Sequence, residues 1–228
     1  MFYYDWTMLL VLPGLLLGMW AQHKVTSAFS RYERVSNKNG MTADEVARRL
    51  LNRHGCSNVN ISQTSGHLSD HYDPSSNQLR LSSSVYGSSS VAAIGVAAHE
   101  CGHAMQKHEG YFPLKLRSML VPVVNLGSNL YFPIFLLGIL FSWEPLITVG
   151  ILCFALTLLF ALVTLPVEFN ASSRAIAALR EDGYLDTEEL KGAKAVLDAA
   201  ALTYVASAIS SLLQLLRLLI LSRRRSRD

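Results

Sequence analysis

Hydrophobic residues gather in four long segments of the chain, at about 4–21, 119–141, 146–165 and 199–221. Each comes close to the roughly 20 consecutive apolar residues that an α-helix needs to cross the hydrocarbon core of a bilayer. Only Ser142-Trp143-Glu144-Pro145 separates the second segment from the third, so we expect a hairpin of antiparallel helices there. The pattern predicts a mostly α integral membrane protein with three to four transmembrane helices. Arg217 and several polar residues inside the fourth segment leave its depth in the bilayer open.

The first segment could be a signal peptide or an uncleaved anchor. A signal peptide has a basic region ahead of its apolar stretch and a small-residue cleavage site behind it. Asp5 stands where the basic residues would lie, and no such cleavage site stands out. We therefore expect residues 1–22 to be a transmembrane anchor.

Between the first two segments the hydrophobic pattern becomes that of shorter elements. Thr42 and Glu45 form a capping box, which predicts the start of an amphipathic helix. Apolar residues alternate with polar ones at 59–61 and 79–81, on either side of a turn-forming run at 73–77. This alternation predicts a small β-hairpin.

A buried helix is expected next, because residues 91–98 are apolar on every side. Ser90 is placed to cap its start and Gly110 to close its end. The helix then carries His99-Glu100-Cys101-Gly102-His103. Positions i and i+4 share one helix face, so both imidazoles can bind one metal ion while the glutamate serves as general base to a water. Two surface histidines are the alternative, and the apolar run argues against it.

A catalytic zinc takes three protein ligands, so a third donor is needed. Glu168 is the best candidate, because it follows the third hydrophobic segment and Pro166 and the hairpin returns the chain to the side it left. The simpler alternative is that Glu168 is only a negative charge at the N-terminus of a helix, where the helix dipole stabilises it. The competing donors lie in one polar run, which could also be a turn capped by aspartates: His67, Asp70, His71 and Asp73.

Composition and charge support a membrane location. Half of the 228 residues are hydrophobic and 16% are charged, with a net charge of +3. Basic residues are frequent between segments one and two and between three and four, while the loop at 142–145 has none, so the positive-inside rule places both polar regions in the cytoplasm. The basic run at 223–227 opposes this if the fourth segment spans fully. Three scattered cysteines imply no disulfide framework.

Four pieces of the chain resemble the YugP-type membrane zinc metallopeptidases of bacteria: 70–74, 79–82, 97–106 and 168–172. That group is similar to the HtpX and CAAX-prenyl-protease gluzincins. The resemblance implies a gluzincin-like unit in which His99, His103 and Glu168 bind one Zn²⁺ and Glu100 is the base. In those relatives an aspartate four residues after the ligand glutamate orients a ligand histidine. Ser172 stands there in this chain, and Asn170 is the other candidate for that role.

We therefore expect a zinc-dependent endopeptidase of membrane-associated or misfolded proteins, in the plasma membrane of a bacterium. Its partners would be the lipid bilayer and polypeptides, not nucleic acid, with a homo-oligomer or other membrane proteins also considered. The expected parts are a 1–22 anchor, a 23–118 catalytic region, a 119–166 hairpin, a 167–198 third-ligand region and a 199–228 helix with a basic tail. Four residues are candidates for contacts to substrate or transition state: His71, Tyr72, Tyr86 and Arg174.

Two other function classes stay open at this point. A metal-binding sensor or assembly subunit without turnover would carry the same residues. A small transporter or channel is disfavoured, because the membrane segments hold almost no ionisable residue apart from Arg217.

Overall fold

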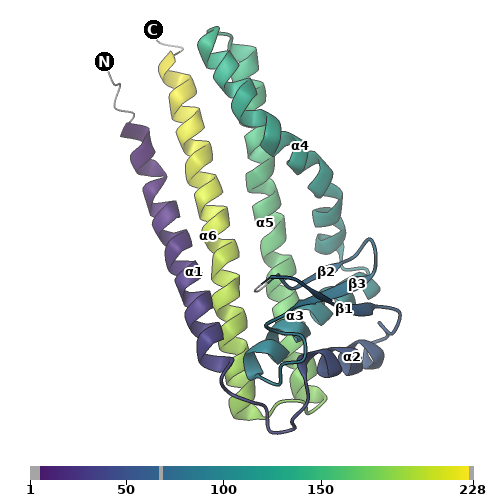
Figure 1. Cartoon of the computed structure of the whole chain (residues 1–228). Helices are drawn as coiled ribbons and strands as arrows, with labels where there is room; N and C mark the ends of the chain where they lie inside the picture. Colours follow the sequence, from purple (N-terminus) through teal and green to yellow (C-terminus); the bar gives the residue numbers. More distant parts are fainter. Residues whose placement is uncertain (1–5, 67–68, 226–228) are drawn as a thin grey trace. The chain divides into compact units, whose positions relative to one another are not determined.

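A computed structural model describes residues 6–66 and 69–225 of the chain, with side chains up to Arg223 (Figure 1). His67, one of the competing metal donors, lies outside the described residues. The chain divides into two compact units that each draw on distant parts of the sequence. The first unit comprises residues 1–21, 116–165 and 203–228, and the second comprises 22–115 and 166–202.

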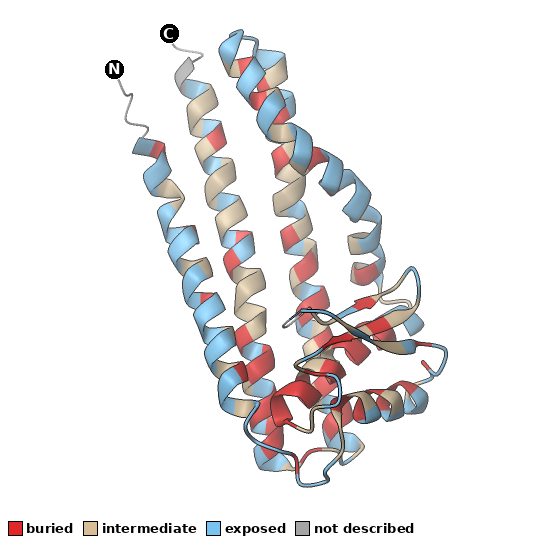
Figure 2. Cartoon of the chain, viewed as in Figure 1, coloured by how far each residue is buried: buried red, intermediate tan, exposed pale blue. Residues whose placement is uncertain are grey.

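The first unit is helical. Its helices are η1 (Trp6–Leu10) and parts of α1 (Leu12–Tyr32), α4 (Phe112–Leu140), α5 (Glu144–Glu181) and α6 (Thr187–Arg225). The described residues hold four helices long and apolar enough to cross a membrane, which confirms the expected mostly helical membrane fold. Large apolar side chains lie exposed along them, among them Leu16 at 63% and Leu152 at 61% (Figure 2). Such surfaces suit a lipid environment and would be unfavourable in water.

Glycines bring α4 and α5 into close contact as a hairpin. A Cβ on Gly138 would lie 2.6 Å from the backbone nitrogen of Ile147, and one on Gly150 would lie 2.8 Å from that of Phe135. Small residues at helix crossings allow this backbone approach in membranes. The turn between the helices places Ser142 in the left-handed region, at φ +52°.

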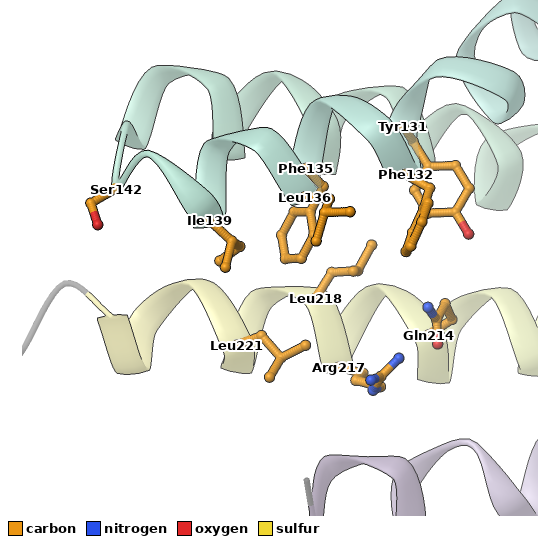
Figure 3. Close-up of a pocket in the computed structure, with 10 residues that line it drawn as sticks. All are labelled: Tyr131, Phe132, Phe135, Leu136, Ile139, Ser142, Gln214, Arg217, Leu218 and Leu221. Carbon is orange, nitrogen blue, oxygen red and sulfur yellow. The ribbon is translucent and has the colours of Figure 1, made fainter. Parts of the chain in front are cut away.

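The first unit also contains an apolar cleft of about 800 Å³ between α4 and α6. Figure 3 shows Phe135 and Leu136 of α4 facing Leu218 of α6 across it. Arg217 lies on the α6 wall, and its Nε donates a hydrogen bond to Thr7 Oγ1 at 3.2 Å. The charged residue within the fourth hydrophobic segment therefore joins α6 to η1.

The second unit is built around α3 (Val91–His108), which is buried along most of its length. Ser90 caps it as expected, since its Oγ accepts a hydrogen bond from the Ala93 N–H at 3.1 Å. Gly110, at φ +69°, follows its end. On one side α3 packs against α2 (Ala43–Arg53), which buries its apolar face.

A three-stranded sheet contacts α3 through β2 and β3. Its strands are β1 (Asn60–Thr64), β2 (His71–Asp73) and β3 (Gln78–Ser82), in the order β1-β3-β2. The expected pairing of 59–61 with 79–81 in a hairpin is wrong, because β1 runs parallel to β3. The hairpin instead joins β2 to β3. The polar β2 was missed since Tyr72 is its one buried residue.

Candidate metal centre

Helices α3 and α5 cross almost backbone to backbone at Gly102. A Cβ at this position would lie 2.5 Å from the carbonyl oxygen of Ala171 and 3.1 Å from its Cα. Any residue other than glycine would hold the two helices apart. Glu168 lies one turn before Ala171 on α5, so this crossing sets its distance from the histidines on α3. Helix α5 reaches this point because it continues through Pro166 without a break.

Three side chains converge from the two helices. Glu168 Oε2 lies 3.2 Å from His99 Nε2 and 3.5 Å from His103 Nε2. Among the described residues, these three form the one group of possible metal ligands, and their ligand atoms all lie within 4.8 Å of one another. Zinc bonds at tetrahedral angles place neighbouring nitrogen and oxygen ligands about 3.4 Å apart. The residues that resemblance assigned to the metal therefore fit a zinc ion.

Gln106 fixes the ring of His103. Its Oε1 lies 3.0 Å from His103 Nδ1, while its Nε2 donates to the carbonyl of Val167 at 2.8 Å. The second bond sets the orientation of the amide, so Oε1 accepts and His103 Nδ1 carries the proton. His103 Nε2 is then the ring atom on the side of Glu168, where it can donate a proton to the carboxylate or bind a metal ion through its lone pair. Ligand histidines in metalloproteins are commonly held in this way.

Ser172 holds the other histidine. Its Oγ lies 3.0 Å from His99 Nδ1, which leaves Nε2 of that ring on the side of Glu168. The serine thus contacts a ligand histidine, as one of the two candidates that the sequence analysis offered for this role. Its hydroxyl is neutral, so His99 is oriented without a further negative charge beside it.

Asn170 and Arg174 extend the network behind His103. Asn170 Oδ1 accepts hydrogen bonds from Gln106 Nε2 at 2.9 Å and from Arg174 Nε at 2.7 Å. Arg174 Nη1 also donates to Glu109 Oε1 at 2.6 Å. Arg174, expected as a substrate contact, is therefore engaged in supporting the centre. The sequence analysis missed Gln106, although a polar residue three positions after a ligand histidine shares its helix face.

The centre is buried and rich in negative charge. Measured over the whole residue, Glu168 is 2% exposed, His103 7% and Glu100 8%. Burial by itself lowers the pKa of His103, but the hydrogen bond that its ring donates to Glu168 and the charges of Glu100 and Glu168 outweigh it and raise that pKa. Two carboxylates gathered around two imidazoles favour the uptake of a cation.

Glu100 turns away from the three converging side chains toward the sheet. Its Oε2 accepts a hydrogen bond from the backbone N–H of Tyr72 at 2.8 Å. Tyr72 thus meets the centre through its backbone, because its phenol donates to Asn77 Oδ1 at 2.6 Å. Burial raises the pKa of this phenol to about 12, so it stays protonated. Glu100 therefore lies beside the three converging side chains and is not a member of that group.

The remaining candidates lie outside this cluster. His71 is exposed, with Nδ1 2.9 Å from the Ser69 carbonyl oxygen, and Tyr86 is 38% exposed. Asp70 accepts hydrogen bonds from the backbone and hydroxyl of Ser82. Hydrogen bonds from Ser75 and Ser76 lower the pKa of Asp73 well below its usual range. The described part of the 67–73 run thus ends in strand β2, its two aspartates accept hydrogen bonds from nearby serines, and none of its described side chains joins the metal group.

Comparisons with known proteins identify the family of the chain. A family model described as "Putative neutral zinc metallopeptidase" matches residues 7–223. The chain is 46% identical over 208 residues to "Putative membrane protease YugP" of Bacillus subtilis (strain 168), an alignment that covers 91% of this chain and 92% of that protein. No solved structure matches the chain significantly. The resemblance drawn from the residues is confirmed, and the chain belongs to the neutral zinc metallopeptidase family.

Proposed function

We propose that this protein is a membrane-embedded, zinc-dependent endopeptidase with one zinc per chain. The observation that carries the proposal is the convergence of His99, His103 and Glu168 at distances that suit tetrahedral zinc. Both Nδ1 atoms are held from behind, so the ligand atoms are oriented before a metal arrives. Three protein ligands leave one position for a water or a substrate, as in catalytic zinc sites.

Glu100 is the general base of the proposed reaction. When bound, zinc supplies a Lewis acid that polarises a carbonyl and lowers the pKa of a water molecule. Tyr72 N–H holds one carboxylate oxygen of Glu100, which leaves the other for proton transfer. Glu100 takes a proton from the attacking water while the oxygen of that water bonds to the carbonyl carbon. Glu100 then delivers the proton to the leaving nitrogen as the C–N bond breaks.

The proposed substrates are membrane-associated or misfolded polypeptides. Strand β2 is an edge strand whose backbone faces Glu100, and an extended peptide can pair with such an edge. Glu168 follows Leu165, the end of the third hydrophobic segment, by three residues. A site this close in sequence to a membrane span is suited to chains at the bilayer surface.

The proposed setting is the plasma membrane of a bacterium, with the site on the cytoplasmic side. This orientation follows from the basic residues of the two polar regions. The bilayer is then a permanent partner, and a homo-oligomer or other membrane proteins are further candidates.

Two substitutions test the proposal. Glu100→Gln should retain zinc and lose hydrolysis of casein, because the amide cannot accept the proton. Glu168→Ala should lose most of the zinc measured by elemental analysis. Glu33→Gln, an exposed position, is the matched control and should keep both properties. Undiminished turnover by pure Glu100→Gln would remove this base, and full zinc in Glu168→Ala would point to another ligand.

The same assay separates the enzyme from a metal-binding sensor or assembly subunit. A sensor would bind zinc through the same three residues without cleaving casein. Hydrolysis by the wild type that a chelator stops and added zinc restores favours the peptidase.

A further inference from the structure

A groove of about 360 Å³ lies between α5 and α6 within the second unit. The residues that line it on α5 recur at helical spacing from Phe169 to Arg180, and those on α6 recur from Lys194 to Ala201. Apolar side chains make up most of its surface, chiefly Phe169, Ile176 and Leu197. A concave apolar surface with a few charged groups is typical of a ligand subsite.

One end of the groove adjoins the metal centre. Ser172 lines the groove and also contacts His99 Nδ1 at 3.0 Å. The side chain of His99 is 14% exposed, against 9% for His103 and 3% for Glu168. His99 is therefore the most accessible of the three metal-binding side chains, and it lies on the side where the groove begins. Phe169, directly after Glu168, is 49% exposed at the same end.

The other end of the groove carries positive charge. Arg180 is exposed and forms no ion pair with any residue that the structure describes. Lys194 is neutralised by Asp198, whose carboxylate lies 2.6 Å from its Nζ. The net charge of this end is thus that of the Arg180 guanidinium.

The length of the groove relates the two ends. Eight helical residues separate Ser172 from Arg180, which is about 12 Å along α5. An extended peptide covers about 3.3 Å per residue. A residue three or four positions from the bond next to the metal would therefore reach Arg180.

We propose that this groove binds the polypeptide on one side of the scissile bond. It selects an apolar side chain near the bond and an acidic side chain three or four residues away. Burial against Phe169, Ile176 and Leu197 favours the apolar side chain, and charge complementarity with Arg180 favours the acidic one. This assignment rests on the proposed peptidase function.

A charge-swap experiment on the zinc-loaded full chain in detergent tests the groove. Matched peptides share an apolar residue at the cleaved bond and differ in glutamate or lysine three or four residues away, on either side. The wild type should cleave the glutamate peptide with a kcat/KM about 1.5-fold to fivefold higher, the range expected for an exposed ion pair. Arg180→Glu should reverse the preference, and Arg180→Gln should abolish it.

Arg49→Glu is the matched control, because Arg49 is exposed on α2 and its substitution changes the net charge of the protein by the same amount. It should keep the preference of the wild type. Ile176→Trp fills the apolar part of the groove and should lower kcat/KM more for peptides with a large apolar residue than for peptides with alanine. Zinc content of each variant checks that the metal centre is intact.

A binding measurement separates this inference from the function on which it rests. Zinc-loaded Glu100→Gln protein should bind the fluorescent glutamate peptide more tightly than the lysine peptide, and Glu100→Gln/Arg180→Glu should show the reverse. Equal preferences in wild type and Arg180→Glu, with hydrolysis retained, would overturn the groove assignment and leave the peptidase standing. A wild type that binds zinc and cleaves nothing would overturn both.

Discussion

Gly102→Ala tests whether the crossing of α3 and α5 builds the metal centre. Alanine is the better helix former by about 1 kcal/mol, so local propensity alone predicts a more stable helix. The tertiary structure predicts the opposite. The new methyl carbon would lie 2.5 Å from the Ala171 carbonyl oxygen, whereas ordinary contacts begin at 3.4 Å. The helices must therefore separate locally by about 0.9 Å, the difference between those two distances.

That displacement is large for a metal site. Glu168 lies one turn from Ala171 and moves with it, while zinc–ligand distances tolerate only about 0.2 Å. Overpacking of this kind costs about 1–3 kcal/mol of folding free energy. Since each 1.4 kcal/mol is a factor of ten, we expect zinc affinity to fall by about tenfold to a hundredfold.

Competition with a chromophoric chelator measures the affinity, and thermal unfolding with and without zinc measures its coupling to stability. The zinc-dependent rise in Tm should shrink in Gly102→Ala. Gly18→Ala is the control, because a Cβ at Gly18 meets nothing within 4 Å. Wild-type zinc affinity in Gly102→Ala would refute the claim that this crossing positions Glu168.

Two further variants examine the network behind His103. Gln106→Leu leaves the buried Nδ1–H of His103 without an acceptor, so zinc affinity should fall about tenfold to a hundredfold in the same chelator competition. Unchanged zinc affinity would count against a positioning role for Gln106. The hydrogen bond and charge of Arg174 lower the pKa of Glu109. This ion pair therefore stabilises the fold at pH values above the ordinary glutamate pKa near 4.5. Its contribution is lost as the pH falls through the lowered pKa of Glu109. Metal-free Glu109→Gln should therefore melt below the wild type at pH 7, and the gap should close at strongly acidic pH; a gap that stays constant would contradict the assignment.

Local patterns along the chain were enough to predict the four membrane segments, α2 and α3. Apolar length alone marks the membrane segments, because a bilayer requires about 20 such residues whatever their neighbours are. The four-residue spacing of His99 and His103 places both on one face of any helix. Ser90 and Gly110 act on backbone groups next to them in sequence, so their roles as start and end signals of α3 were also predictable.

Contacts between distant residues were decided only by the tertiary structure. Strand β2 has too short and polar a pattern to be recognised, and the parallel pairing of β1 with β3 depends on the path of the chain between them. Nothing near Gly102 in sequence indicates that Ala171 fills the space where its side chain would be.

The metal centre combines both kinds of information. Its histidines follow from helical periodicity, and Glu168 could be proposed only because a membrane hairpin returns the chain. The partners that orient the ligands, Gln106 and Ser172, act through hydrogen bonds whose geometry depends on where α3 and α5 cross. Periodicity specifies which face of a helix a residue occupies, whereas only packing specifies what that face meets.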